Sequence, residues 1–326
     1  MNRLSLAEFE AQAERFDSMA LASPDIDAFC SSAAWIVPAH KAFHPEQDLL
    51  LFEGEFGYLA LARGHAPNLG TYLAPVEAMW GLASPLVGAE APRLAIDAWR
   101  TLRASISDWD ALWLCGLSPH GAAFKALAML AGQGQRLFVG PTTYRHVALL
   151  EGGFEGWLSR RARAFRKGLR QAQRRTEEAG VVFEWHDAFT PEAQVEMYQR
   201  VLAVDDRSWK GLDAQGLRAS NMASFYDHMT AYLAQRGALR AVFATLDGED
   251  IAMGFGGILG PTFRGLQMSY DDRFKHLSLG NLIQQELIMR VAAEGLEYYD
   301  LGTEMDYKRR WSHPGLETVA LVVRSR

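Results

Sequence analysis

Two side chains near the C-terminus of this sequence, Tyr307 and Lys308, are suited to proton transfer. They follow a strand-like segment that ends at Asp300-Leu301-Gly302, and Trp311 lies one helical turn beyond them. Acylation of an amine requires a group that removes a proton from the amine and a group that protonates the leaving thiolate. A tyrosine or a lysine at the mouth of a sheet can serve in either role. Packing of Tyr307 and Trp311 in the core is the alternative, and the sequence leaves both interpretations open.

A second candidate site lies earlier, where a strand ends and an amphipathic helix begins. The short loop between them carries Ser278, Gly280 and Asn281. The first turn of a helix exposes unpaired backbone N–H groups and the positive end of the helix dipole, which suits it to a pyrophosphate. Capping of the helix by Ser278 would explain the same pattern. The loop is therefore a candidate phosphate site, with simple capping as the alternative.

The segment 157–175 is the densest positive run in a chain with a formal net charge of −6, and it contains no acidic residue. Read as one helix, it carries cations along a narrow stripe and apolar side chains on the opposite face. The stripe consists of Arg163, Arg166, Lys167, Arg170 and Arg174. Arginine suits phosphates, so Arg166 and Arg170 are predicted to contact a phosphate-bearing ligand: a coenzyme A tail, a nucleotide-sugar or a tRNA backbone. A solvated amphipathic helix is the alternative.

These residues must be positioned by helices and strands whose order repeats along the chain. The first half is predicted to contain helices at 4–16 and 25–43, a hairpin at 49–62, a helix at 92–106, a strand at 111–115, a helix at 121–130 and a strand at 144–150. The second half is predicted to contain a hairpin at 239–259, a strand at 263–270, a helix at 280–294, a strand at 298–301, a short helix at 304–311 and a last strand at 318–323. The shared order favours two copies of one α/β unit, as domains 1–150 and 151–326.

Length and composition agree with two globular domains. The chain has 326 residues, of which 49% are hydrophobic and 22% charged, which is enough for sizeable cores. No apolar stretch approaches the roughly 18 residues of a membrane span, and the acidic N-terminal segment does not read as a signal peptide, so a soluble, cytoplasmic protein is expected. The two cysteines, Cys30 and Cys115, lie far apart without metal-ligand spacing, so neither a disulfide nor a metal is expected.

The sequence contains no GxSxG, HExxH or Walker motif, and no GxGxxG follows a predicted strand. Hydrolases, metalloproteases, NTPases and dinucleotide-binding enzymes therefore lack support.

Over about residues 150–315 the sequence resembles the GNAT acetyltransferases of the CelD-like type, relatives of the FemAB peptidyltransferases. The resemblance rests on six motifs in order: Arg166-Lys167-x-x-Arg170, Ser208-Trp209-Lys210-Gly211, Ser269-Tyr270-Asp271, Leu277-Ser278-Leu279-Gly280, Tyr299-Asp300-Leu301-Gly302 and Tyr307-Lys308-x-x-Trp311. It implies an α/β (α+β) fold of tandem GNAT-like domains, each a mixed, mostly antiparallel sheet flanked by helices. The first domain is expected to be degenerate and the second catalytic.

The resemblance also implies N-acyl transfer from acetyl-CoA or another acyl-CoA to an amine of a small molecule, an amino sugar or a peptide. The family's pyrophosphate loop falls on Ser278, Gly280 and Asn281, and its general acid on Tyr307. Lys308 and Asp271 complete the catalytic candidates, although a carboxylate after a strand is often a turn cap. The remaining candidates, predicted to bind substrate, are Trp209, Lys210, Tyr270, Glu304 and Trp311.

Two other functions stay open. One is a FemAB-like transferase that takes an aminoacyl group from tRNA, with the arginine stripe on RNA phosphates, although no long helical hairpin is visible in the sequence. The other is a non-catalytic accessory protein of polysaccharide biosynthesis, because the pyrophosphate loop is reduced to Leu277-Ser278-Leu279-Gly280 and a fold does not fix a function. The sequence does not specify the acceptor, the acyl chain or the oligomeric state.

Overall fold

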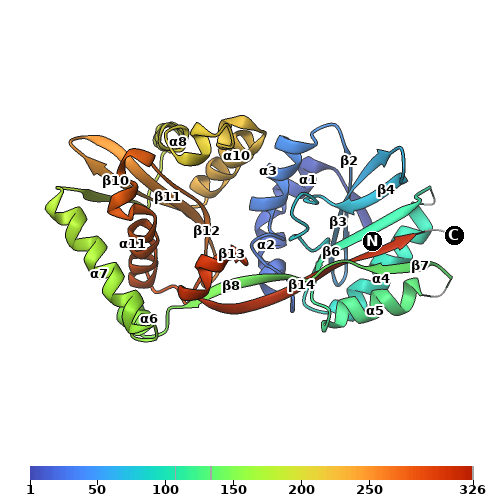
Figure 1. The fold of residues 1–326 in the computed structure, drawn as a ribbon. Coiled ribbons are helices and arrows are strands. Elements are labelled where there is room, and N and C mark those ends of the chain that lie inside the picture. Colours follow the sequence, from blue (N-terminus) through green and yellow to red (C-terminus); the bar gives the residue numbers. More distant parts are fainter. Residues whose placement is uncertain (107, 133, 325–326) are drawn as a thin grey trace. The chain divides into compact units, whose positions relative to one another are not determined.

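The computed structural model describes residues 1–106, 108–132 and 134–324, and the chain divides into two compact units. The first unit contains residues 1–144 and the C-terminal segment from Leu316, and the second contains residues 145–315. Each unit combines a mostly antiparallel sheet with flanking helices (Figure 1). The predicted mixed α/β fold class is confirmed.

The first unit is built on strands in the order β1-β2-β3-β4-β6-β14, in which β4 and β6 are parallel and the other neighbours described are antiparallel. Two short strands lie off this path: β5 pairs with β3, and β7 pairs with β14. The strands are β1 (Asn2–Leu4), β2 (Asp48–Gly54), β3 (Gly57–Ala66), β4 (Gly70–Pro75), β5 (Leu86–Val87), β6 (Ala111–Leu117), β7 (Arg136–Val139) and β14 (His313–Arg324). The helices are α1 (Leu6–Ala11), α2 (Ala13–Ala22), α3 (Ala33–Phe43), α4 (Ala91–Ser105) and α5 (Ala122–Ala131).

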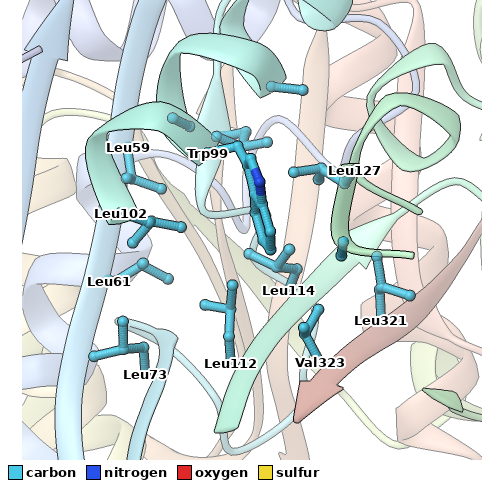
Figure 2. Close-up of a cluster of buried hydrophobic side chains, with 14 of the residues drawn as sticks. Leu59, Leu61, Leu73, Trp99, Leu102, Leu112, Leu114, Leu127, Leu321 and Val323 are labelled. Atoms are coloured by element: carbon cyan, nitrogen blue, oxygen red, sulfur yellow. The ribbon is translucent and has the colours of Figure 1, made fainter. Parts of the chain in front are cut away.

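Successive side chains of β3 point to opposite faces of this sheet, and each face has its own core. Tyr58 contacts Phe9 and Phe16 of the N-terminal helices through edge-to-face ring contacts. Leu59 belongs instead to a leucine-rich cluster that also contains Trp99 of α4, as Figure 2 shows. Consecutive apolar residues along the first part of β3 thus bury the strand on both faces.

Two predicted helices have different bounds in the structure. Residues 4–16 form the end of β1, then α1 and the start of α2, because Ser5 and Glu8 make a capping box that starts α1 at Leu6. Residues 25–43 are helical only from Ala33. The buried carboxylate of Asp17 accepts a hydrogen bond from the Ala33 N–H, and that of Asp27 accepts one from the Cys30 N–H. These side-chain bonds to the backbone hold a turn in place of an earlier helical start.

The second unit has strands in the order β8-β13-β12-β11-β10-β9, in which β12 and β13 are parallel. The strands are β8 (Thr143–Leu149), β9 (Val182–His186), β10 (Leu239–Leu246), β11 (Glu249–Leu259), β12 (Thr262–Tyr270) and β13 (Tyr298–Thr303). The α-helices are α6 (Gly153–Ser159), α7 (Arg163–Glu178), α8 (Pro191–Asp206), α9 (Trp209–Leu212), α10 (Met222–Gln235) and α11 (Leu279–Ala293). Three 3-10 turns complete the unit: η1 (Leu217–Ala219), η2 (Asp272–Leu277) and η3 (Asp306–Arg310).

Helices cover both faces of this second sheet. On β11, the Gly254 position approaches Ile283 and Leu287 of α11, so closely that a Cβ there would lie 2.5 Å from Ile283. The next residue, Phe255, points to the other face and contacts the Tyr226 ring of α10. Figure 1 accordingly shows α11 and α10 on opposite sides of β11. The glycine in β11 allows α11, which carries part of the site, to lie close to the sheet.

The last strand predicted for each half pairs in the other unit. The strand expected at 144–150 is β8, which pairs with β13 in the second unit. The strand expected at 318–323 is β14, which pairs with β6 and β7 in the first unit. The two compact units therefore have different bounds from the predicted domains 1–150 and 151–326. The last two residues of the second predicted domain lie outside the described part of the chain. A sequence pattern reveals a strand but not its partner.

The basic segment is two helices instead of the one that was predicted. Helix α6 ends at Ser159, and α7 begins at Arg163. Between them Arg161 turns inward: its Nη2 lies 2.8 Å from Nε2 of His313, and its guanidinium lies over the Trp157 ring. Helix α7 keeps the predicted two faces, because Leu169 and Ala172 are buried while Arg163, Lys167, Arg170 and Arg174 are exposed.

We predict that Trp99→Ala lowers the free energy of unfolding by about 3–5 kcal/mol, the usual cost of truncating a buried tryptophan. Trp99 is 6% exposed and packs within the leucine cluster of the first unit. Met129→Ala on the neighbouring α5, where the side chain is 64% exposed, is the control and should change stability by less than about 1 kcal/mol. Urea denaturation followed by circular dichroism measures both. Equal losses in the two variants would contradict the assignment of this core.

Candidate functional site

A cavity of about 690 Å³ opens in the second unit where two parallel strands separate. Among the described residues, β12 and β13 pair only over Thr262–Arg264 and Tyr298–Asp300. Beyond this point, residues 265–270 of β12 and Leu301 of β13 line the cavity. Its volume falls in the range of about 300–1,000 Å³ that is usual for small-molecule sites. The splayed strand ends thus form a pocket whose walls are backbone edges as well as side chains.

Most of the predicted site residues meet at this cavity. The predicted residues that line it are Trp209, Lys210, Tyr270, Ser278, Gly280, Asn281, Tyr307, Lys308 and Trp311. They come from α9, β12, the start of α11 and the η3 region, which are distant in sequence. Residues from motifs that lie far apart in the sequence therefore meet at one cavity.

Lys308 is the most strongly perturbed cation in the cavity wall. The residue is 7% exposed, and its Nζ donates a hydrogen bond of 2.7 Å to the Thr303 carbonyl. Burial is the main cause that lowers the pKa of Lys308 to about 8; the positive charges of Arg264 and Arg145 act in the same direction, and the Asp300 carboxylate opposes them. An amine with this pKa exchanges protons readily near neutral pH, as a general base must.

The sequence left two interpretations open for this motif, proton transfer and core packing. The structure agrees with the first for Tyr307 and with the second for Trp311. Tyr307 is 37% exposed, and burial of its ring raises the pKa of its hydroxyl, so it stays protonated at neutral pH and is available as a proton donor. Trp311 is 1% exposed and stacks on Trp157, whose Nε1 donates a hydrogen bond to the Trp311 carbonyl. Trp311 is thus a packing residue that also closes one side of the cavity.

The loop before α11 differs from an ordinary helix cap. Ser278 has φ of 60°, in the left-handed region, and its side chain makes no capping hydrogen bond. Its hydroxyl instead accepts a hydrogen bond of 3.2 Å from Nη2 of Arg175 on α7. The Gly280 position lies against the Tyr270 ring, and the Asn281 N–H donates to the Ser278 carbonyl. A strained residue next to a helix start and an arginine is a pattern found at ligand sites.

The predicted phosphate contacts on α7 are not the ones that reach this loop. Arg166 is half-buried, Arg170 is exposed, and neither lines the cavity. Arg175, which was not among the predicted site residues, lies nearer the end of the same helix and contacts Ser278. Its position five residues after Arg170 rotates it off the stripe, so the helical stripe alone could not identify it.

Asp271 and Glu304 do not line the cavity, and their ion pairs argue against the predicted roles. Burial opposes ionisation of Asp271, but hydrogen bonds from Arg273 and Arg207 outweigh it and lower the pKa of this carboxyl. Such a carboxylate is a poor base, and it also accepts the Arg273 N–H at the start of η2. Glu304 forms an ion pair of 2.6 Å with Arg309. Both residues hold loops beside the site.

Lys210 projects from the start of α9 beside a buried carboxylate. Asp205 is 1% exposed, and its two oxygens accept hydrogen bonds of 2.6 Å from the Ser269 hydroxyl and the Leu217 N–H. Nζ of Lys210 lies 3.9 Å from the same carboxylate. Burial lowers the pKa of Lys210, and the Asp205 charge opposes this effect. The neighbouring Trp209 is 50% exposed at the cavity rim.

Gln284 and Tyr299 also line the cavity, although neither was among the predicted site residues. Gln284 lies three and four residues after Asn281 and Gly280, on the same face of α11, so helical spacing from the loop could have identified it. Tyr299 is two residues before Leu301 on β13 and therefore shares its face of the strand. Burial raises the pKa of the Tyr299 hydroxyl strongly, so it acts as a neutral hydroxyl.

No helix within the described residues combines the length and apolar character that crossing a membrane requires. The same residues contain no cluster of three or more His, Cys, Asp or Glu side chains that could hold a metal ion.

Part of the sequence matches a known family, and the fold is similar to that of several solved structures. Residues 163–309 match the family described as an acetyltransferase (GNAT) domain. No curated protein matches the sequence. Among solved structures, FemX aligns with a TM-score of 0.68 and 13% identity over 98% of this chain and 97% of that one. A conserved protein of unknown function from Bacteroides thetaiotaomicron VPI-5482 aligns with a TM-score of 0.64 and 10% identity over 97% of both chains. L-PGS from Bacillus licheniformis aligns with a TM-score of 0.55 and 12% identity over 99% of this chain and 93% of that one.

We predict that the low pKa of Lys308 makes the stability of the protein depend on pH. Between pH 8 and 10.5 the unfolded lysine binds more protons than the folded one, so the folded state gains stability as pH rises. The free energy of unfolding of the wild type should therefore increase by ~1–3 kcal/mol relative to Lys308→Met across this range. Urea denaturation at several pH values measures the difference. The exposed Lys125→Met on α5 is the control, and a pH-independent difference for Lys308→Met would contradict the burial of its charge.

Proposed function

We propose that this chain is an N-acyltransferase, because residues 163–309 match the GNAT acetyltransferase domain and the chain shares its fold with FemX. These findings support acyl transfer in general. The finer proposal is that an acyl group passes from acyl-CoA to an amine of a small molecule, an amino sugar or a peptide. The observation that carries it is the placement of a proton donor, Tyr307, and a lysine of lowered pKa, Lys308, in one cavity between separated strands.

The donor is proposed to bind along the start of α11 and the edge of β12. The pyrophosphate would lie at the first N–H groups of α11, beside Ser278 and the guanidinium of Arg175. The acyl arm would follow residues 265–270 of β12, whose side toward β13 is unpaired in the described structure beyond Arg264. Backbone groups there can bind and polarise the thioester carbonyl, which stabilises the charge that develops on its oxygen.

The reaction is a direct transfer in which one C–N bond forms and one C–S bond breaks. The lone pair of the acceptor amine attacks the thioester carbonyl, and the neutral amine of Lys308 accepts the proton that the nitrogen loses. Collapse of the tetrahedral intermediate expels the thiolate, and the Tyr307 hydroxyl supplies its proton. Positioning of donor and acceptor in one cavity contributes much of the rate, because it makes the attack effectively intramolecular.

A second candidate donor, aminoacyl-tRNA, is favoured by one observation. Four exposed cations on α7 are spaced at intervals of four, three and four residues, so they lie on one stripe of a 16-residue helix. The four are Arg163, Lys167, Arg170 and Arg174. Within the described residues, the ion pair found for this stripe is Arg174 with Glu178. A row of three arginines and one lysine, with few acidic partners, suits a nucleic-acid backbone.

Titration with acetyl-CoA, longer acyl-CoAs and free CoA tests the donor. We predict micromolar binding by calorimetry and a higher melting temperature in thermal-shift assays. Arg175→Ala should weaken binding by about tenfold or more, because it removes a charged contact at the loop, whereas Arg170→Ala should leave it unchanged. Absence of binding for every CoA species would reject the acyl-CoA donor. Binding of tRNA that Arg170→Ala weakens would then support the second candidate.

Tyr307→Phe tests the catalytic assignment. We predict that kcat for acetyl transfer falls by about 10²–10⁴-fold with little change in KM, since the hydroxyl acts on the leaving thiolate and not in binding. Thiol release from acetyl-CoA gives the rate. Tyr144→Phe, which removes an exposed hydroxyl outside the cavity, is the matched control. An unchanged kcat in Tyr307→Phe would exclude this tyrosine as the acid.

A further inference from the structure

The ionisable side chains that line the cavity include lysines but no carboxylates among the described residues. Three lysines line it, Lys210, Lys275 and Lys308, and no Asp or Glu in the described parts of the chain lines it. The chain as a whole has a formal charge of −6, so the local excess does not follow from composition. Positive charge concentrated in a concave site attracts anions and repels cations.

Two of these lysines already have roles or partners. Lys275 is 69% exposed, pairs with Asp272 at 3.3 Å and lies on η2, three residues before the loop proposed for the donor pyrophosphate. Lys308 donates its hydrogen bond to the Thr303 carbonyl beside Tyr307, at the proposed site of proton transfer. Lys210 is the remaining cation, and it lies on a different wall of the cavity, at the start of α9.

The ammonium of Lys210 is held in place but makes no hydrogen bond to the described residues. The oxygens of Asp205 are committed to Ser269 and Leu217, and the distance of 3.9 Å to Nζ exceeds a hydrogen bond. The side chain is 26% exposed and lines the cavity, so the ammonium is accessible to a ligand there. The three N–H groups of the Lys210 ammonium can therefore donate hydrogen bonds to a ligand in the cavity. The Asp205 carboxylate attracts the ammonium and opposes the lowering of the Lys210 pKa by burial.

We infer that the acceptor of the acyl group is an anionic amine, whose carboxylate or phosphate binds Lys210 while its amino group faces Tyr307 and Lys308. This inference rests on the proposed function and narrows its substrate class. Amino acids, peptides with a nearby carboxylate and phosphorylated amino sugars fit the site, whereas polyamines and lysine-rich peptides do not. The surrounding positive charge also favours the neutral form of a bound amine, which is the nucleophile.

Matched pairs of amines that differ in one negative charge test the inference by calorimetry. The pairs are alanine with alaninamide, and glucosamine 6-phosphate with glucosamine; spermidine is the cationic probe. The full chain is titrated in the presence of saturating CoA or acetyl-CoA. We expect the anionic member of at least one pair to bind about tenfold or more tightly than its neutral partner, and the preferred pair distinguishes carboxylate from phosphate.

Variants of Lys210 assign this preference to one side chain. Lys210→Gln should reduce the discrimination between the members of a pair to less than about threefold, and Lys210→Arg should retain it. The control Lys125→Gln lies outside the cavity and should retain it as well. Circular dichroism confirms that each variant is folded.

The outcomes separate this inference from the proposed function. Equal binding of charged and neutral members, or discrimination that survives in Lys210→Gln, would overturn the inference even if acyl transfer occurs. Preferential binding of anionic amines without any acyl transfer would support the inference on the acceptor and reject the proposed function. Tight binding of spermidine would also overturn it.

Discussion

The site depends on one constraint, the separation of two parallel strands at a buried ion pair. Arg264 and Asp300 are the last residues at which β12 and β13 pair, and their side chains form an ion pair at that point. The Asp300 carboxylate also accepts the Gly302 N–H at 2.7 Å, which turns the backbone at a glycine with φ of 82°. A buried ion pair contributes little net stability, but it fixes the geometry of the groups that form it. Here it marks where the sheet ends and the cavity begins.

This ion pair also shapes the chemistry of the cavity. Arg264, Asp300 and Lys308 are all buried, and Gly302 brings the backbone close to the Arg264 guanidinium and the Lys308 ammonium. Desolvation together with two neighbouring arginines therefore outweighs one carboxylate, and the pKa of Lys308 falls. The same separation of strands that makes room for a ligand thus places a lysine where its charge is costly.

The sequence identified many of the residues that line the cavity, but it gave little information on what each of them contacts. Hydrophobic periodicity placed β12, α11 and β13 correctly, so the residues that follow these elements met as expected. Roles depend on partners that are distant in the chain. Asp271 could not be recognised as the partner of Arg207 and Arg273, and Ser278 could not be distinguished from a helix cap, because its partner Arg175 lies on another helix. Arg170 was predicted from a helical stripe, but it is exposed and does not line the cavity. Local patterns specify elements, whereas contacts between elements decide function.

The last strand has a consequence for the order in which the protein is completed during synthesis. The strands of the second unit, from β8 to β13, all precede β14 in the chain, so they can pair with one another before β14 is synthesised. Most of the first unit is synthesised earlier. Its strand β6, however, can pair with β14 only after the second unit has been synthesised, because β14 follows the other strands described. Such long-range pairing is slow and leaves strand edges exposed while it is incomplete. The first unit is therefore synthesised first but completes its strand pairing last. Until β14 is available, the edges of β6 and β7 stay unpaired on that side, and a chaperone would need to protect them.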